Sequence, residues 1–258
     1  MNPFQAYLIG LAQTDGHLSS QSRNRGKFTL ELQYRDIDIL HKIAENLECN
    51  YTIGERTRTT NFSKDYRSAY IRVCDRRFRS FLEENGVPVG RKSNIIKPPI
   101  DLDQNLHVDY LRGLIDGDGS VGITSVNKPF LGFVTGSEVM KDFFVWWMEK
   151  NTERKFTKLS RTSRDNIYQP VLYNEDAQSA IIKIYYSNCM ALKRKLEKAK
   201  EVIQWERPLD IKKVNFQRKR WEPWEDGILM DCSNQEAVAN LGRSLKSVTI
   251  RRWRLNNA

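Results

Sequence analysis

The sequence lacks the features that mark membrane proteins, secreted proteins and proteins stabilised by disulfides or structural zinc. It has no apolar run long enough to cross a bilayer and no signal peptide, so we expect an intracellular protein, in a bacterial or phage-encoded cytoplasmic setting or an organelle, with no membrane partner. The cysteines have no Cys-x-x-Cys spacing, which argues against structural zinc and against a disulfide framework. They are Cys49, Cys74, Cys189 and Cys232. The three histidines form no metal-ligand pattern either.

Acidic residues are scarce relative to basic ones. Lys and Arg number 42 against 32 Asp and Glu, which gives a formal net charge of +10. Such an excess is typical of proteins that bind nucleic acid, although many basic proteins of other classes share it. At 258 residues the chain suggests one to two domains and is long enough to bury a sizeable core.

One ten-residue pattern occurs twice in the chain, 103 positions apart: residues 7–16 read YLIGLAQTDG and residues 110–119 read YLRGLIDGDG. The apolar positions of each copy share one helical face, so both copies predict a helix. A glycine inside a helix costs about 1 kcal/mol relative to alanine, yet Gly10 and Gly113 recur at the same place. We therefore expect the two helices to pack with their backbones in close approach.

Both copies end in Asp-Gly. We expect Gly16 and Gly119 to take the left-handed conformation that stops helices, which leaves Asp15 and Asp118 at two adjacent helix C-termini. Two carboxylates there repel each other and the helix dipoles, and a bound divalent cation would offset that repulsion. The pattern thus predicts a shared acidic centre with one carboxylate from each half.

The two copies resemble the motif of the LAGLIDADG homing endonucleases, of the single-chain kind that carries two motif copies. The resemblance covers roughly residues 4 to 205. It implies an α+β fold of two pseudo-symmetric αββαββα repeats, whose antiparallel sheets form a saddle over duplex DNA. It also implies a monomeric, site-specific double-strand DNA endonuclease that leaves short 3′ overhangs.

The periodicity of each half agrees with this element order. In the first half we expect helices over 4–14, 36–47 and 75–85 and strands over 17–21, 27–33, 51–57 and 66–74. In the second half we expect helices over 106–117, 138–151, 177–185 and 190–203 and strands over 120–124, 130–135, 155–160 and 167–173. The predicted domains are two repeats over 1–100 and 101–205, a basic linker over 206–220 and a small all-α module over 221–258.

The polar faces of these strands carry side chains suited to base readout in a major groove, where Arg or Lys pairs with guanine and Gln or Asn with adenine. For any single residue an ordinary solvated sheet face is nearly as good an interpretation, but for the face as a group recognition is the better one. Candidates in the first half are Lys27, Thr29, Glu31, Gln33, Arg56, Arg58, Arg67, Tyr70 and Arg72. Candidates in the second half are Lys155, Lys158, Arg161, Arg164, Tyr168 and Gln169.

The resemblance implies roles at the acidic centre. Asp15 and Asp118 are the implied essential acids and metal ligands, helped by the carbonyl groups of Thr14 and Gly117. The implied cofactor is two or three Mg²⁺ ions, with Mn²⁺ as a substitute and Ca²⁺ binding without cleavage; two such ions supply an attacking water and stabilise charge on the phosphate. The motif's first acidic letter is Gln13 in one half and Asp116 in the other, an asymmetry that is common in the family and is not expected to abolish activity.

Basic and polar side chains complete such centres in the family. A lysine before the last helix of each half is implied to approach the cleavage centre, and we choose Lys92 and Lys193; nonspecific phosphate contact is the alternative role. Gln33 is the candidate for ordering water near the metals. The second half offers only Thr135 or Ser137 for that task, so the two strands are expected to be cut at unequal rates.

The C-terminal segment lies outside these repeats. Residues 221–258 predict three short helices, with Ser233 and Ser244 as caps, and resemble a helix-turn-helix of the Myb/SANT sort. Its candidate DNA contacts are Arg243, Lys246, Arg251 and Arg254. The alternative is a basic C-terminal helix docked on the rest of the protein.

The best interpretation is therefore a Mg²⁺-dependent homing endonuclease from a mobile intron or a free-standing gene. No splicing residues frame the chain, which argues against an intein. Two alternatives use the same scaffold: an RNA maturase whose partner is the host intron RNA, and a noncatalytic DNA-binding regulator. Asp15 and Asp118 argue against both alternatives, because neither activity needs paired acids.

Overall fold

The computed structural model describes residues 1–21, 25–59, 64–157, 159–208 and 221–256. It divides into two compact units, Met1–Arg207 and Pro208–Ala258. Most of the predicted basic linker, residues 209–220, lies outside the described residues. Among the described residues, no helix is both long and apolar enough to cross a membrane.

The first half of the larger unit has the predicted order of helices and strands. Its four strands form one antiparallel sheet in the order β1-β2-β4-β3. The elements are α1 Pro3–Thr14, β1 Gly16–Ser20, β2 Gly26–Gln33, the 3₁₀ turn η1 Tyr34–Asp36, α2 Ile37–Glu45, β3 Tyr51–Arg58, β4 Tyr66–Val73 and α3 Arg76–Glu84. The inward residues of β2 and β4 are buried, so this face of the sheet packs on helices and the other face is polar.

The second half has one strand fewer than predicted. Its sheet has the order β5-β6-β7. The elements are η2 Gln104–Leu106, α4 His107–Asp118, β5 Gly119–Ile123, β6 Pro129–Phe133, α5 Glu138–Asn151, β7 Val171–Tyr173, α6 Asn174–Ile184 and α7 Lys193–Ile203. The half therefore departs from the αββαββα order that the resemblance implies.

The missing strand has a local explanation. The described residues of 155–160 pair with no neighbour, and the strand predicted over 167–173 shrinks to β7. Asn166 takes a left-handed conformation, with φ of 53°, and Pro170 has no N–H to donate to a ladder. Only an isolated bridge between Thr135 and Tyr168 extends the pairing before that proline.

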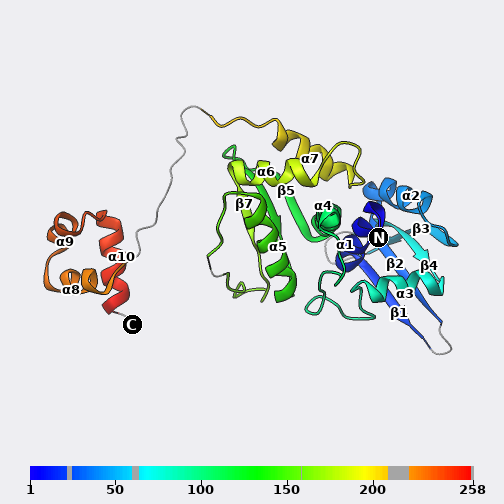
Figure 1. Cartoon of the computed structure of the whole chain (residues 1–258), viewed down its shortest axis with the longest axis horizontal. Helices are drawn as coiled ribbons and strands as arrows, with labels where there is room; N and C mark the ends of the chain where they lie inside the picture. The colour runs from blue at the N-terminus through cyan, green and yellow to red at the C-terminus, as the bar shows by residue number, and fades with distance from the viewer. Residues whose placement is uncertain (22–24, 60–63, 158, 209–220, 257–258) are drawn as a thin grey trace. The chain divides into compact units, whose positions relative to one another are not determined.

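Helices α1 and α4 lie side by side between the two sheets (Figure 1). Asn2 begins α1 by accepting from the backbone N–H of Gln5 at 2.9 Å, with Pro3 at the first helical position. Both helices are buried on nearly every side, as expected for elements at the centre of a core. They pack so closely that a Cβ on Gly10 would collide with the carbonyl oxygen of Tyr110.

The glycines that follow the motif helices do not take the predicted conformation. Gly119 is extended, with φ of −97° and ψ of 174°, and Gly16 begins strand β1. Their role is steric, because a Cβ on Gly16 would lie 2.6 Å from the carbonyl oxygen of Ala12 and one on Gly119 2.6 Å from Cα of Ile115. The chain can therefore turn directly from each helix into its strand only where a side chain is absent.

The smaller unit consists of three helices, α8 Pro223–Asp231, α9 Asn234–Leu241 and α10 Leu245–Asn256. Ser233 caps α9, and its capping box with Glu236 closes both ways. Gly242 ends α9 in the left-handed conformation, with φ of 59°. The core of the unit is small and consists of Leu229, Ala237, Leu241 and Val248.

Candidate active site and nucleic-acid interface

The two motif aspartates lie at the C-terminal ends of α1 and α4. Asp15 is the C-cap of α1, and its N–H donates to the carbonyl oxygen of Leu11 at 3.0 Å. Asp118 is the last residue of α4. Because these two helices pack against each other, their ends bring one carboxylate from each half to a common centre.

The ionisation of these carboxyl groups is perturbed. Although both residues reach solvent, the surrounding protein desolvates the Asp15 carboxyl and, together with the charge of Asp118, raises its pKa to about 6. Desolvation also raises the pKa of Asp118 above its ordinary value. Two mutually repelling carboxylates of raised pKa are poised to accept a cation.

A lysine approaches this centre in each half. The Lys92 ammonium donates to the carbonyl oxygen of Ala12 at 2.7 Å and to that of Gly16. The Lys195 ammonium donates to the carbonyl oxygens of Ile115, Asp116 at 2.7 Å and Gly119 at 2.9 Å. Desolvation lowers the pKa of each lysine to about 8. Both therefore place positive charge at the carbonyl end of a motif helix, where the dipole favours a cation.

Lys193 does not approach the acid pair, and the lysine of α7 that does so is Lys195, two residues later. Lys193 is the first residue of α7 and is exposed, whereas Lys195 is 6 % exposed and faces inward with Ala199 and Val202. Helical periodicity explains the difference, since residues 195, 199 and 202 share the buried face of α7. Lys92 and Lys195 are themselves 103 positions apart, so the spacing of the repeat could have indicated Lys195.

We expect Asp15→Asn to raise the thermal stability of the metal-free protein at pH 7.5. The carboxyl binds its proton more tightly in the folded state, so stability falls as pH rises from about 4 to about 6 and stays low above it. Because the group is partly screened by solvent, the expected rise in Tm is only about 2–4 °C, the effect of about 1 kcal/mol. Calorimetry from pH 4 to pH 8 measures it. A gain that persists undiminished at pH 4 would contradict the explanation.

The donors around the acid pair fit a hard divalent cation. Among the described residues, no group of three or more His, Cys, Asp or Glu side chains forms a metal site. The available ligands are thus the carboxylates of Asp15 and Asp118 with backbone oxygens, and Mg²⁺ characteristically combines one or two carboxylates with water and substrate phosphate. The Gly117 carbonyl oxygen, predicted to bind metal, lies 3.3 Å from the Lys195 ammonium. Thr14 uses its hydroxyl to donate to the Leu11 carbonyl oxygen at 2.9 Å.

The two halves differ beside the acid pair. Gln33 ends β2 with an exposed side chain. The pairing of Gly16 with Leu30 and of Gly119 with Phe133 aligns Gln33 with Gly136, which has no side chain. The hydroxyl of Ser137 donates to the Ile96 carbonyl oxygen at 2.6 Å and that of Thr135 accepts from the Ser137 N–H at 3.1 Å. Both second-half candidates are therefore engaged within the protein.

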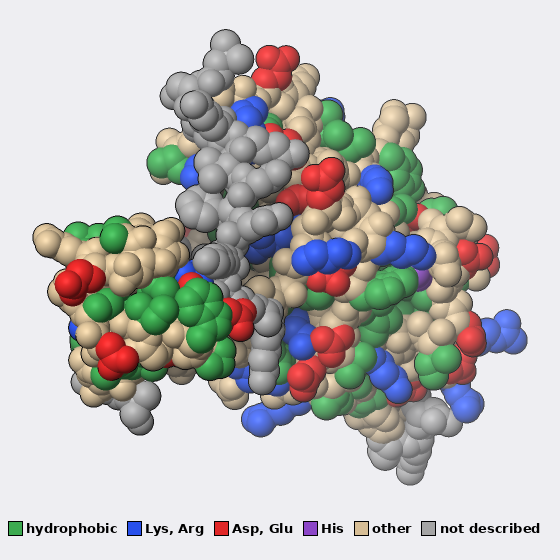
Figure 2. Space-filling model, turned by 60° about the vertical axis from the view of Figure 1, so that its left-hand side comes forward, with side chains coloured by type: hydrophobic (Ala, Val, Ile, Leu, Met, Phe, Trp, Pro, Cys, Tyr) green, Lys and Arg blue, Asp and Glu red, His purple; other side chains and the backbone are tan. Residues whose placement is uncertain are grey.

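The polar face of the first sheet is organised around Glu31. Its carboxylate lies 3.2 Å from the guanidinium groups of both Arg56 and Arg58 and accepts from the Ser68 hydroxyl at 2.6 Å. The Tyr70 ring lies between Arg56 and Arg72, 5.5 and 5.0 Å from their guanidinium carbons. Thr29 pairs with Arg72 across the strands, and Lys27 and Gln33 share this face by alternation. Lys and Arg side chains are interspersed with acidic ones over the face in view in Figure 2.

Arg67 does not belong to this face. In β4 the residues 66, 68, 70 and 72 share the polar side, and Arg67 alternates with them on the side of Ala69 and Ile71. Its guanidinium lies 3.8 Å from the centre of the Tyr34 ring and 2.7 Å from the Glu55 carboxylate. The prediction that groups Arg67 with Tyr70 and Arg72 is wrong, because successive side chains of a strand point to opposite faces of the sheet.

The candidates in the second half are more scattered. Tyr168 is only 7 % exposed, and Arg161 spans its ring while donating to the carbonyl oxygen of Gly136 at 2.8 Å. Both residues thus hold the irregular segment over 159–170 against the sheet, and neither is free for base contact. Exposed side chains remain at Lys155, Arg164 and Gln169. Lys158 lies outside the described residues.

The basic residues of the small unit divide into two groups. Arg243 is largely buried, lying 2.5 Å from the Glu225 carboxylate, and Arg251 lies 2.5 Å from Asp226. Arg251 joins α10 to α8, and Arg243, which lies between α9 and α10, is also held on α8, so their assignment as DNA contacts is corrected. The exposed side chains of α10 repeat at helical spacing and form one face. They are Leu245, Lys246, Thr249, Ile250, Trp253, Arg254 and Asn256.

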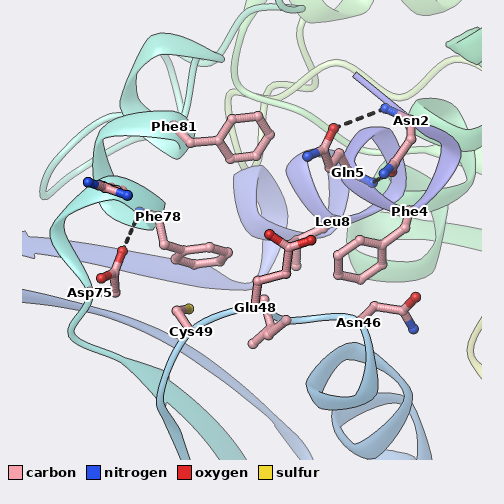
Figure 3. A pocket seen from close by; sticks show the side chains of 12 residues that line it. Asn2, Phe4, Gln5, Leu8, Asn46, Glu48, Cys49, Asp75, Phe78 and Phe81 are labelled. Atoms are coloured by element: carbon pink, nitrogen blue, oxygen red, sulfur yellow. Dashed lines mark hydrogen bonds between the residues drawn. The ribbon is translucent and has the colours of Figure 1, made fainter.

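A pocket of about 460 Å³ lies away from the acid pair, between the start of α1, the residues after α2 and the start of α3 (Figure 3). Phe4, Phe78 and Phe81 line it together with Glu48 and Asp75. The Asp75 carboxylate caps α3 by accepting from the N–H of Phe78 at 2.8 Å. None of the residues predicted for catalysis or DNA contact lines this pocket.

Comparison with solved structures identifies the architecture. A point mutant of I-SmaMI matches with a TM-score of 0.50 and 12 % identity, over 79 % of this chain and 90 % of that chain. The fold is similar to that of I-SmaMI. The LAGLIDADG homing endonuclease I-LtrWI, solved bound to its target DNA, gives a TM-score of 0.47 at 12 % identity, over 78 % of this chain and 88 % of that chain. At this level of identity the likeness to I-SmaMI concerns the fold alone.

Sequence comparison finds distant relatives and no matching family model. The tRNA-splicing ligase RtcB of Pyrococcus abyssi is 30 % identical over 139 residues, 48 % of this chain and 14 % of the ligase. RtcB of Methanopyrus kandleri is 25 % identical over 195 residues, 69 % of this chain and 18 % of the ligase. The replication factor C small subunit of Methanocaldococcus jannaschii is 26 % identical over 121 residues, 45 % of this chain and 7 % of the subunit. The chain thus spans less than a fifth of the curated relatives it matches.

Proposed function

We propose that this protein is a divalent-metal-dependent endonuclease that cuts both strands of a long, specific DNA duplex. The observation that carries the proposal is the acid pair, one carboxylate at the end of each central helix, with a largely buried lysine beside each. The raised pKa of Asp15 favours a cation at this centre, since a bound cation relieves the repulsion between the carboxylates. The net charge of +10 suits a polyanionic substrate.

The residues of this centre have distinct tasks under the proposal. Asp15 and Asp118 hold divalent cations, aided by the carbonyl groups of Thr14 and Gly117. The bound ions supply the charge stabilisation and the activated water that phosphodiester hydrolysis needs. Lys92 and Lys195 add positive charge beside the scissile phosphates, and Gln33 orients water in the first half. Since Gly136 occupies the matching place in the second half, the two strands are cut at different rates.

Base readout is assigned to the polar face of the first sheet. Glu31 holds Arg56 and Arg58 in place, and a guanidinium that is already oriented loses less entropy on meeting a guanine. In the small unit, the exposed face of α10 that contains Lys246 and Arg254 is assigned to a second DNA contact, in the manner of a recognition helix. This assignment gives the helix-turn-helix resemblance a specific surface.

Arg58→Ala should weaken DNA binding roughly 5- to 150-fold, because one good base contact contributes about 1–3 kcal/mol of discrimination. Arg67→Ala is the matched control, since it removes the same charge from the same sheet on the opposite face. Binding is measured by fluorescence anisotropy with Ca²⁺ in place of Mg²⁺. Equal losses for the two variants would show that charge alone, and not this face, carries recognition.

The curated relatives bear on the genetic setting of the protein. The tRNA-splicing ligase RtcB and the replication factor C small subunit share no activity by name, and the matching stretches are 14 % and 7 % of these proteins. We infer that a chain matching only a minor part of each of these proteins belongs to an independent genetic element. Homing of such an element from an intron or a free-standing gene is the biological role that we propose.

The proposal is tested by cleavage of a randomised duplex library with Mg²⁺, with Mn²⁺ and with Ca²⁺. We expect enrichment of one long target, cut on both strands with Mg²⁺ or Mn²⁺ and bound without cutting with Ca²⁺. Binding of DNA without cleavage under every metal would overturn the nuclease assignment. A parallel gel shift with structured intron RNA distinguishes a maturase, which would bind the RNA and leave the library intact.

A further inference from the structure

The residue at the motif's first acidic position makes unusually many buried contacts. In the second half, the Asp116 carboxylate accepts from the Tyr185 hydroxyl at 2.8 Å, the Leu192 N–H at 2.7 Å and the Tyr7 hydroxyl at 2.8 Å. In the first half, the Gln13 amide donates to the carbonyl oxygens of Gly86 and Lys97, both at 2.8 Å. Neither residue is exposed by more than 1 %. Neither Gln13 nor Asp116 can therefore reach DNA or a metal from its place in the core.

The contacts of Gln13 and Asp116 hold the two segments that carry Lys92 and Lys195. Gly86 and Lys97 flank Lys92, so one amide group holds the loop at both ends. Tyr185 ends α6 and Leu192 is the N-cap of α7, whose first turn contains Lys195. Each segment then returns its lysine to the carbonyl groups around the aspartate of its own half.

The chemistry of each anchor matches what its segment offers. The first segment presents two carbonyl oxygens, which need a donor, and Gln13 supplies an amide NH₂. The second presents a backbone N–H and a hydroxyl, which need an acceptor, and Asp116 supplies a carboxylate. Gly86 has φ of +83° and a Cβ there would lie 3.0 Å from the Gln13 amide nitrogen, so the backbone also leaves room for the anchor. The Gln/Asp difference between the halves thus follows from the polarity of the backbone groups to be held.

We propose that Gln13 and Asp116 are positioning residues, and that each fixes the segment which delivers a lysine to the carbonyl oxygens at the end of the motif helix of its own half. The inference rests on the proposed nuclease function and deepens it. It assigns Lys92 to Gln13 and Lys195 to Asp116, so a defect at one anchor should slow one strand cut and spare the other. A purely structural role predicts instead a loss shared by both strands.

The test is strand-resolved, single-turnover cleavage of a duplex labelled separately on each strand, taken from the selected target. We expect Asp116→Leu to slow the same strand as Lys195→Ala, by on the order of 10- to 100-fold, the effect of losing an outer-shell partner. The double variant should be no slower than Lys195→Ala alone, because both changes remove the same placement of the ammonium. Gln13→Leu should slow the other strand, the same strand that Lys92→Ala slows.

Conservative variants keep the test independent of folding. Asp116→Asn should recover most of the rate lost in Asp116→Leu, because its amide oxygen can accept from Leu192 and Tyr7 while its NH₂ donates to the Tyr185 hydroxyl. Gln13→Glu should not recover the rate, because its carboxylate would face two carbonyl oxygens. Melting temperatures and DNA binding in Ca²⁺ show that these two variants are folded.

The possible results distinguish failure of the positioning roles from failure of the proposed nuclease function. A wild-type protein that cuts neither strand refutes the proposed function. If the wild type cuts both strands, two results would refute the positioning roles alone. One is an Asp116 or Gln13 variant that slows both strands equally. The other is a double variant whose loss of rate is the product of the losses of the anchor variant and the lysine variant.

Discussion

Asp118→Asn and Asp15→Asn should each abolish double-strand cleavage while leaving DNA binding intact. Each substitution removes one of the two carboxylates at the helix ends and keeps the size of the side chain. The expected loss in the cleavage rate is on the order of 10³-fold, similar to the effect of removing one preorganised charge-stabilising group. Binding in Ca²⁺ should change little, because readout is assigned to the sheet face and not to the acid pair.

A matched control is Asp142→Asn, since Asp142 is an exposed aspartate on α5 paired with Lys141 at 2.7 Å. It should cut at the wild-type rate. The measurement is conversion of supercoiled plasmid to nicked and linear forms over time. Undiminished linear product from either motif variant would remove that carboxylate from the chemistry, and nicked product alone would assign each acid to one strand.

Gly113→Ala should destabilise the larger unit more than any other single-methyl addition in this chain. Its Cβ would collide with the carbonyl oxygen of Tyr7 and lie 2.8 Å from the backbone nitrogen of Leu11. No rotamer relieves a clash with backbone atoms, so α1 and α4 must separate. We expect a loss of roughly 3–5 kcal/mol, beyond the usual range for overpacking, and a fall in Tm of about 10 °C.

Gly227→Ala provides the contrast, because a Cβ at this position in α8 meets nothing within 4 Å. It should leave the transition of the larger unit unchanged and favour α8 by up to about 1 kcal/mol through helix propensity. Urea denaturation followed by circular dichroism measures both variants. A Gly113→Ala protein as stable as the wild type would show that the two helices are not held at this separation in solution.

The features that the sequence predicted well are those carried by repetition and short-range pattern. The two motif copies located both central helices, and their shared glycines predicted the close approach of α1 and α4. The strand β2 of the first half followed from the alternation of residues 27–33. The three helices of the small unit followed from caps such as Ser233.

The features that were missed depend on contacts that local pattern does not encode. A strand forms only where a partner offers a ladder, and the described residues of 155–160 have none. Lys193 and Lys195 look alike in sequence, and only the buried face of α7 separates them. Arg243 was assigned to DNA because its buried partner, Glu225, lies 18 positions away in sequence. The anchoring roles of Gln13 and Asp116 were missed for the same reason, since their partners lie more than 65 positions away.

The hydroxyl groups of the two motif tyrosines cross between the central helices. Tyr7 of α1 donates to Asp116 of α4 at 2.8 Å, and Tyr110 of α4 donates to Gln13 of α1 at 2.5 Å. Each half therefore completes a buried polar site whose other members belong to the opposite half. In a chimera that joins this N-terminal half to a foreign C-terminal half, the foreign half must supply residues compatible with Gln13 and Tyr7, as Tyr110 and Asp116 do here. Half-exchange to build new DNA specificities will succeed only between chains matched at these four positions.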